Sequence, residues 1–151
     1  MTNSDRKLRA YIAGPITSSG SLHENLQKGI KVGEEVRQIG IHPFIPHLYD
    51  FTKIVTGGEV EWEDMLQLDE NFILACDLII ALPGESKGKE REILHGEKNG
   101  IPTFRLGPLT GPLWLPSRCS PQERSELLND DDWEKLTLLV EQWEQSRKIS
   151  I

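Results

Sequence analysis

The sequence predicts an α/β fold of the flavodoxin or Rossmann-like type, a three-layer sandwich in which a parallel sheet of four or five strands has helices on both faces. Two observations predict it. Short β-type segments alternate with amphipathic helical segments along most of the chain, and residues 78–82 form an unbroken apolar run of the kind a central parallel strand needs.

The first strand and helix are predicted from their boundaries. Residues 8–13 are rich in β-branched and aromatic side chains, and a Gly-Pro pair ends this strand. Ser21 followed three residues later by Glu24 is a capping-box pattern, and apolar or small residues then recur at three-to-four spacing until Gly40. The small Gly29 and Gly33 would let this helix pack closely on the sheet.

The next strand is predicted at residues 41–46, where two prolines favour an outer rather than a central position. After a loop at 47–58, a helix is expected at 61–75. At 100° per residue, one face of that helix carries Met65, Leu66, Leu68, Phe72, Ile73 and Ala75. Asp69 falls on the same apolar face, where a carboxyl is costly unless it is hydrogen-bonded or faces a cleft.

The second half continues the alternation. After the strand at 78–82 we expect a helix at 89–98, a strand at 101–106 and an irregular loop at 107–121. A last helix, at about 130–147, begins with acidic residues that suit a helix N-terminus. It presents one stripe that should dock either on the chain's own core or on another subunit: Trp133, Leu136, Val140 and Trp143.

Composition narrows the class of protein. The chain's 151 residues suit a single domain that spans residues 1–151. Its net charge of −7 argues against binding to a nucleic-acid polymer, which needs a basic surface. Cys76 and Cys119 show no metal-ligand spacing, the four histidines at 23, 42, 47 and 95 form no metal motif, and no metal or other cofactor is expected. No segment reads as a membrane span or signal peptide, so a cytoplasmic location is expected.

Glu92 is the candidate nucleophile, because it follows the carboxyl end of the predicted central strand, where ligands bind in open α/β folds. A carboxylate in the first turn of a helix can also be a simple partner of the helix dipole. The same dipole could instead keep the carboxylate ionised and aimed into the crevice, and Asp69 could supply a second, proton-donating carboxyl. The loop that starts at Gly14 leads into a helix N-terminus and could approach a phosphate or sugar, although GxGxxG and P-loop motifs are absent.

Several motifs in order resemble the nucleoside 2-deoxyribosyltransferase family, which includes deoxynucleoside 5'-monophosphate N-glycosidases. The resemblance covers roughly residues 8–106 and rests on the following residues: Tyr11-Ile12-Ala13-Gly14-Pro15-Ile16-Thr17, Asp69, Cys76-Asp77, Leu82-Pro83-Gly84, Ser86, Gly88 and Glu92. It implies cleavage of an N-glycosidic bond, with Glu92 as nucleophile, Asp69 as the acid that assists the base, and Tyr11 beside the nucleophile. Substrate-binding positions would be Gly14, Pro15, Ile16, Ser86 and Gly88.

Ser86 is the position that the resemblance makes decisive. The nucleoside transferases tend to carry an acid there for the sugar 5'-hydroxyl, whereas the monophosphate hydrolases carry a serine for the 5'-phosphate. An acid would repel phosphate, and Ser86 beside Lys87 would accept it. Lys89 and Arg91 make this loop more basic than is usual in the family, and Glu85 and Glu90 add acid.

The sequence therefore predicts an enzyme that cleaves the N-glycosidic bond of a nucleoside or its 5'-monophosphate. Base exchange between nucleosides is the alternative activity, and a nucleotide-binding sensor without turnover is the alternative outside the enzymes. The expected partner is a small nucleoside or nucleotide, with no membrane partner. The resemblance also implies a homo-oligomer whose neighbouring subunits complete each site.

Overall fold

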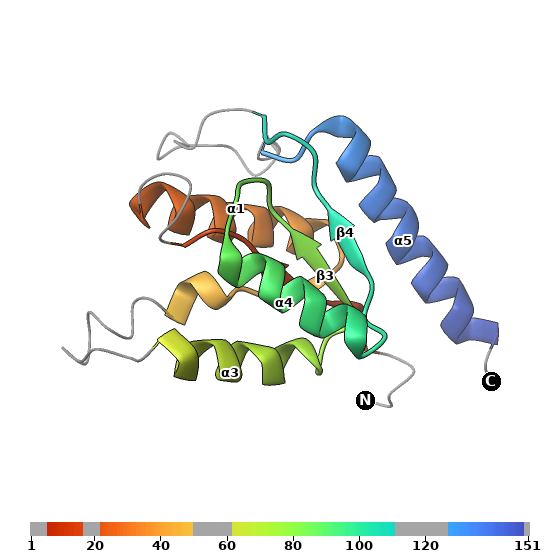
Figure 1. Cartoon of the computed structure of the whole chain (residues 1–151). Helices are drawn as coiled ribbons and strands as arrows, with labels where there is room; N and C mark the ends of the chain where they lie inside the picture. The colour runs from red at the N-terminus through yellow and green to blue at the C-terminus, as the bar shows by residue number, and fades with distance from the viewer. Residues whose placement is uncertain (1–5, 17–21, 50–61, 111–126, 150–151) are drawn as a thin grey trace.

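The computed structural model describes residues 6–16, 22–49, 62–110 and 127–149 (Figure 1). Features of the sequence that lie outside the described residues are Thr17, the Ser21 cap, Gly58, Cys119 and most of the 107–121 loop. Within the described part, no helix is long and apolar enough to cross a membrane.

A parallel sheet forms the middle layer, as predicted. Its strands are β1 (Arg9–Ala13), β2 (His42–Phe44), β3 (Leu78–Ala81) and β4 (Thr103–Arg105), in the order β2-β1-β3-β4. The strand with two neighbouring prolines, β2, is at the edge, where a missing backbone N–H costs least. The strand order reverses direction between β1 and β3, which makes the carboxyl ends of these two strands the expected ligand site of the fold.

Helices cover both faces of the sheet (Figure 1). The helices α1 (Leu22–Ile39) and α5 (Asp130–Ile149) enclose one hydrophobic cluster, and α3 (Trp62–Ile73) and α4 (Lys87–Lys98) contribute to the other. Alternate strand residues face the two clusters: the α1 side takes Ala10, Ile12, Leu78 and Ile80, and the α4 side takes Tyr11, Ala13, Ile79 and Ala81.

The apolar stripe of α5 packs on the chain's own core. Leu136 is fully buried, Val140 is 8% exposed, and the partly buried Trp133 and Trp143 pack against the same cluster. Of the two alternatives left open by the sequence, the described residues therefore support intramolecular docking for this stripe.

Three details differ from the expectations. The helix α4 begins at Lys87 rather than Lys89, because Ser86 acts as its N-cap and accepts a hydrogen bond from the Lys89 backbone N–H at 3.2 Å. In α3, Leu68 is 37% exposed although it lies on the predicted apolar face, and Ala75 falls beyond the end of the helix and is exposed. A 3₁₀ helix, η2 (Pro46–Tyr49), follows β2 directly.

Candidate active site

Three of the predicted site residues meet on the α4 side of the sheet, close to the point where the strand order reverses. Tyr11 comes from β1, Asp69 from the face of α3 that packs toward α4, and Glu92 from α4. All three are buried, with exposed fractions of 0%, 5% and 6%. The helical pattern that placed Asp69 on an apolar face is confirmed by this burial.

These three side chains interact electrostatically. Burial raises the pKa of Tyr11 above its usual range, and the charges of Glu92 and Asp69 raise it further. The Tyr11 hydroxyl is buried and has no hydrogen-bond partner among the described residues, as is also true of one oxygen of each carboxyl. The phenol therefore lies in the electrostatic field of two acids that come from different helices.

The pKa of Glu92 is far from its usual value. Burial, and then the charge of Asp69, raises the pKa of Glu92 from 4.5 to about 8, although the Tyr11 hydroxyl opposes this change. The sequence left open whether the helix dipole keeps this carboxylate ionised. Because α4 starts earlier than expected, Glu92 lies in its second turn, where the dipole effect has faded.

The two carboxyls together can supply one proton donor and one carboxylate. Two acids this close in a dry site do not ionise together without a large electrostatic cost, so after the first proton has left, the remaining one is shared between them. A site with one charged and one neutral carboxyl has the groups that glycoside chemistry requires.

The N-terminus of α4 borders an open groove, and Tyr11, Asp69 and Glu92 are not among its lining residues. The groove has a volume of about 530 Å³ and is lined by Gly84, Glu85, Ser86, Lys87, Lys89 and Glu90. Gly88 lies in the first turn of α4 next to this lining, and the space where it would carry a Cβ has only ordinary contacts, the nearest at 3.8 Å from Ser86 Oγ. The structure therefore places both Ser86 and Gly88 at a helix N-terminus that faces solvent.

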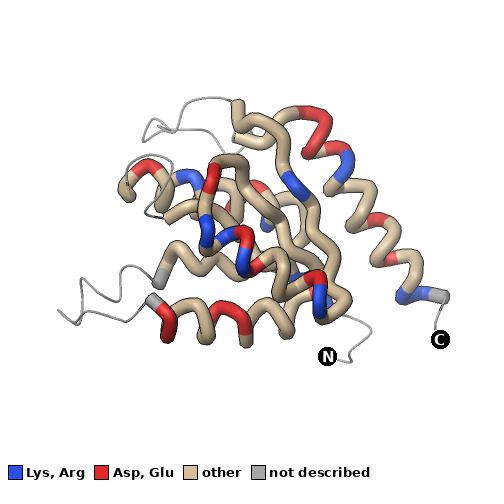
Figure 2. Tube along the Cα trace, in the orientation of Figure 1, with Lys and Arg blue, Asp and Glu red and all other residues tan. Residues whose placement is uncertain are grey.

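The basic residues of this segment bind other parts of the chain. Lys89 is 6% exposed, and its Nζ donates to the backbone carbonyls of Leu82, at 3.1 Å, and Gly84. Arg91 lies on the other side of α4 and bridges to α3, with hydrogen bonds to Glu63 at 2.9 Å and to Glu70 at 2.7 Å. Figure 2 shows basic and acidic residues on α4 and acidic residues on α3. The extra positive charge noted in the sequence is thus used for folding.

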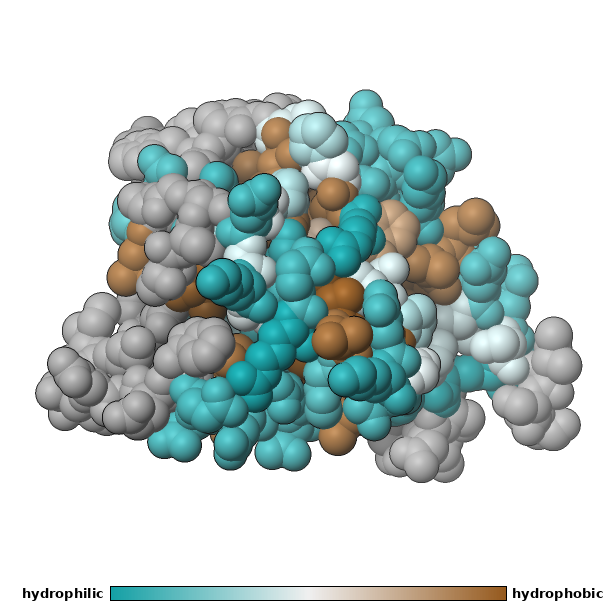
Figure 3. Space-filling model, in the orientation of Figure 1, coloured by the Kyte–Doolittle hydropathy of each residue, from teal (hydrophilic) through white to brown (hydrophobic). Residues whose placement is uncertain are grey.

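The surface around these helices is mainly hydrophilic in the view of Figure 3, with small apolar patches between charged residues. Among the described residues, no group of three or more His, Cys, Asp or Glu side chains is arranged to hold a metal ion.

Gly14, Pro15 and Ile16 follow β1 at the same edge of the sheet. A Cβ on Gly14 would lie 3.1 Å from Leu82 Cβ and 3.4 Å from His47 Nε2, so the backbone is tightly enclosed there. Asn25 on α1 fixes the next part of the loop, since its Nδ2 donates to the Ile16 carbonyl at 3.0 Å. The enclosure by Leu82 and His47 and the hydrogen bond from Asn25 therefore fix the segment that follows β1.

His47 is a residue at this edge whose role the sequence did not reveal. It is fully buried in η2, packs against Gly29 of α1, and interacts with the backbone of Pro15. Burial lowers its pKa from 6.5 to about 4, so the imidazole is neutral. Its position directly after an outer strand was the available signal, because that places it near the carboxyl edge of the sheet.

The fold and this site define a flavodoxin-like α/β protein with a buried pair of carboxyls and a buried tyrosine on the α4 side of its sheet. Residues 8–104 match the model of the family described as "Domain of unknown function (DUF4406)", and the chain belongs to that family. No curated protein matches the chain.

Solved structures show the same fold. The 2-deoxyribosyltransferase of the psychrotolerant bacterium Bacillus psychrosaccharolyticus aligns with 65% of this chain and 71% of its own, at 20% identity and a TM-score of 0.50. A conserved protein of Enterococcus faecalis aligns over 97% of this chain and all of its own, at 19% identity and a TM-score of 0.53. A 2-desoxiribosyltransferase of Leishmania mexicana has 23% identity over 66% of this chain and 63% of its own, with a TM-score of 0.46. The Bacillus and Enterococcus structures confirm the fold that the resemblance in the sequence implies.

Proposed function

We propose that this protein cleaves the N-glycosidic bond of a nucleoside 5'-monophosphate or nucleoside, with 2'-deoxy substrates preferred. The observation that carries the proposal is the buried group of Tyr11, Asp69 and Glu92 on the α4 side of β1 and β3, next to the point where the strand order reverses. A buried acid with a strongly raised pKa beside a second acid is typical of catalytic groups.

In the proposed reaction, Glu92 and Asp69 have different roles. The proton that the two acids share moves to Asp69, which leaves Glu92 as the carboxylate. A Glu92 oxygen attacks C1' of the sugar, the bond between C1' and the base nitrogen breaks with its electron pair going to the base, and Asp69 protonates the departing base. Water then attacks C1', the bond between C1' and the Glu92 oxygen breaks, and the Asp69 carboxylate takes the proton from water. The sugar is thereby released, and both acids return to their starting states.

Tyr11 has a positioning role in this scheme. Its hydroxyl can donate a hydrogen bond to Glu92, which stabilises the carboxylate form in an apolar environment. The raised pKa of Tyr11 keeps the phenol protonated, so it remains a donor throughout the reaction.

The nature of residue 86 favours a phosphorylated substrate. Ser86 caps α4 with its oxygen and adds no negative charge, so a phosphoryl group can approach the groove without repulsion from this position. Base exchange between nucleosides is the competing activity, and the structurally similar Bacillus protein is named a 2-deoxyribosyltransferase. In base exchange, a second free base would attack C1' of the glycosyl ester in place of water.

A product assay tests the proposal directly. The protein is incubated with deoxynucleosides and deoxynucleoside 5'-monophosphates, with and without a second free base, and the bases are separated by chromatography. Free base together with sugar phosphate supports hydrolysis, and a new nucleoside supports exchange. Binding without any product would contradict both and favour a nucleotide sensor.

The nucleophile is tested by Glu92→Gln, with Glu97→Gln as the matched control. Glu97 lies on the same helix but is exposed and does not line the groove. Glu92→Gln should lower kcat by at least about a thousandfold, because an amide does not form the glycosyl ester. Turnover at the level of the Glu97→Gln control would show that the nucleophile lies elsewhere.

The choice between nucleotide and nucleoside is tested by Ser86→Asp. Aspartate is also a good N-cap residue, so α4 keeps its start while the groove gains a negative charge. The variant should raise KM for a monophosphate and leave KM for the nucleoside nearly unchanged. An equal rise for both substrates would remove the phosphate argument.

The homo-oligomer implied by the resemblance is a separate part of the proposal. The α5 stripe is already covered by the chain's own core, so other surfaces would have to form the contact. Light scattering on the purified protein measures its mass, and a monomer at assay concentrations would exclude a site completed by a neighbouring subunit.

A further inference from the structure

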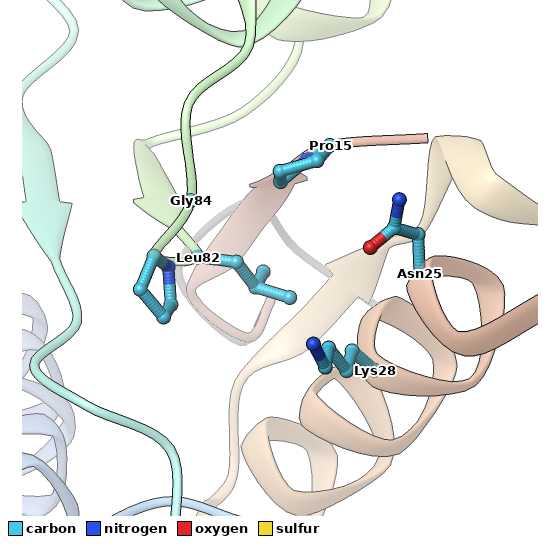
Figure 4. Close-up of a pocket in the computed structure, with 6 residues that line it drawn as sticks. Pro15, Asn25, Lys28, Leu82 and Gly84 are labelled. Atoms are coloured by element: carbon cyan, nitrogen blue, oxygen red, sulfur yellow. The ribbon is translucent and has the colours of Figure 1, made fainter. Parts of the chain in front are cut away.

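A small pocket lies across the sheet edge from the α4 groove. It has a volume of about 190 Å³, and its lining residues come from β1, α1 and the end of β3: Pro15, Asn25, Lys28, Leu82, Pro83 and Gly84. Figure 4 shows Lys28 and Asn25 reaching from α1 toward the segment that contains Leu82 and Gly84. The pocket therefore opens at the same carboxyl edge as the candidate active site.

Lys28 is the one charged side chain among the lining residues. It is half-buried, and within the described part of the chain it has no hydrogen bond or ion pair to a carboxylate. The other basic residues near this edge are either bound within the fold, as Lys89 and Arg91 are, or exposed, as Lys87 is. In a chain with a net charge of −7, an unneutralised lysine in a pocket attracts an anion.

The size of the pocket limits what part of a ligand it can hold. Small-molecule sites that enclose a whole ligand occupy roughly 300–1,000 Å³, and a single water accounts for about 30 Å³. At about 190 Å³, this pocket accommodates one compact group with a few waters. The rest of the ligand must lie outside it.

Gly84 joins the pocket to the place where the rest of the ligand would lie. It lines both this pocket and the groove at the N-terminus of α4, and it has no side chain to separate them. Its φ of 109° is accessible to glycine and costly for other residues, so the turn itself requires a glycine there. A ligand can therefore extend from Lys28 across Gly84 toward Ser86.

We propose that this pocket binds the phosphoryl group of the substrate and that Lys28 supplies its counter-charge. Phosphate is a compact anion that pairs well with an ammonium group. Ser86 adds no negative charge that would repel a phosphorylated substrate, and Lys28 adds a positive charge that attracts it. The identity of the substrate rests on the proposed function, whereas binding of the anion does not.

The test measures binding of inorganic phosphate, ribose 5-phosphate and ribose by calorimetry and by ³¹P NMR, without any turnover. Wild type is compared with Lys28→Gln, Lys28→Arg, Lys87→Gln and Lys98→Gln, after circular dichroism has shown that each is folded. Lys98 is an exposed residue at the other end of α4, so its variant controls for the loss of one positive charge.

We expect Lys28→Gln to weaken binding of both phosphates by tenfold or more, the size typical of losing a hydrogen bond to a charged group. Lys98→Gln should change it less than about twofold, since a remote charge is screened by salt, and Lys28→Arg should restore part of it. Three outcomes would overturn the proposal. Phosphate could bind equally well to the Lys28→Gln and Lys98→Gln variants, its binding could be lost only in Lys87→Gln, or wild type could fail to bind it. If phosphate binding depends on Lys28 but no base is released from any nucleotide, the proposed function fails and the phosphate pocket stands.

Discussion

Arg91 on α4 donates a hydrogen bond from Nε to Glu70 on α3 at 2.7 Å. Arg91 immediately precedes Glu92 in the sequence, and Glu70 immediately follows Asp69. The ion pair therefore joins the chain neighbours of the two buried carboxyls and fixes α3 and α4 at the point where those carboxyls meet.

Arg91→Gln should loosen this contact. We expect a lower kcat with a smaller change in KM, because the separation of Asp69 and Glu92 would vary while the groove at Ser86 remains. Arg105→Gln is the matched control, since Arg105 pairs with Glu90 on the exposed surface. Kinetics with both variants check the prediction, and an equal effect of the two would contradict a positioning role for Arg91.

Glu92→Gln should stabilise the folded protein at alkaline pH. The pKa of Glu92 is raised from 4.5 to about 8 on folding, so ionisation of this group lowers stability as the pH rises from below 4.5 through 8. A tenfold change in a protonation equilibrium is worth roughly 1.4 kcal/mol, so the free energy of unfolding of the two proteins should differ by a few kcal/mol above pH 8. Urea unfolding of wild type and variant at pH 4.5 and 8.5 measures it. A stability difference that does not grow with pH would show that Glu92 is ionised without penalty.

His47→Phe should change stability in the opposite pH range. The pKa of His47 falls from 6.5 to about 4 on folding, so the unfolded chain takes up a proton first as the pH is lowered. Wild type should lose up to about 3 kcal/mol between pH 6.5 and 4, and the phenylalanine variant should lose less over that interval. Direct titration of the imidazole by NMR is the control measurement, and a normal pKa near 6.5 would contradict the prediction.

Two glycine substitutions should have opposite effects. A Cβ on Gly29 would lie 2.5 Å from His47 Cγ, so Gly29→Ala should destabilise by about 1–3 kcal/mol in spite of its better helix propensity. Gly88→Ala meets no contact closer than 3.8 Å and should stabilise α4 by up to about 1 kcal/mol.

Gly88→Ala also tests whether Gly88 is near the substrate. A methyl group there would project at the N-terminus of α4, so KM should rise although the fold becomes more stable. Thermal unfolding and KM are measured on the same preparation. An unchanged KM would remove Gly88 from the proposed substrate contacts.

Most of the fold could be predicted because its signals are local. The continuous apolar run at residues 78–82 indicated the central strand, and the prolines beside β2 indicated its edge position. The start of α4 was missed because Ser86, Lys87 and Gly88 have the composition of a loop, and only the backbone shows that Ser86 is a cap. Leu68 was misplaced because α3 packs mainly on α4, so that less of its circumference is covered than a sheet would cover.

The candidate site, like the fold, was predicted from the sequence only in part. Helical spacing placed Asp69 on an apolar face, and position after a central strand singled out Glu92. The protonated state of Glu92 depends on burial and on a neighbour 23 residues earlier in the sequence, which are tertiary properties. His47 likewise became visible only when η2 met Gly29 on α1.

Lys89 gives the α4 groove a positive charge that is already immobile. Its ammonium group is held by the carbonyls of Leu82 and Gly84, and ordering a long side chain of this kind on binding would otherwise cost about 0.5–1.5 kcal/mol. Under the proposed function, an anion in the groove would meet a positive charge whose side chain is already ordered, so binding would not have to order it.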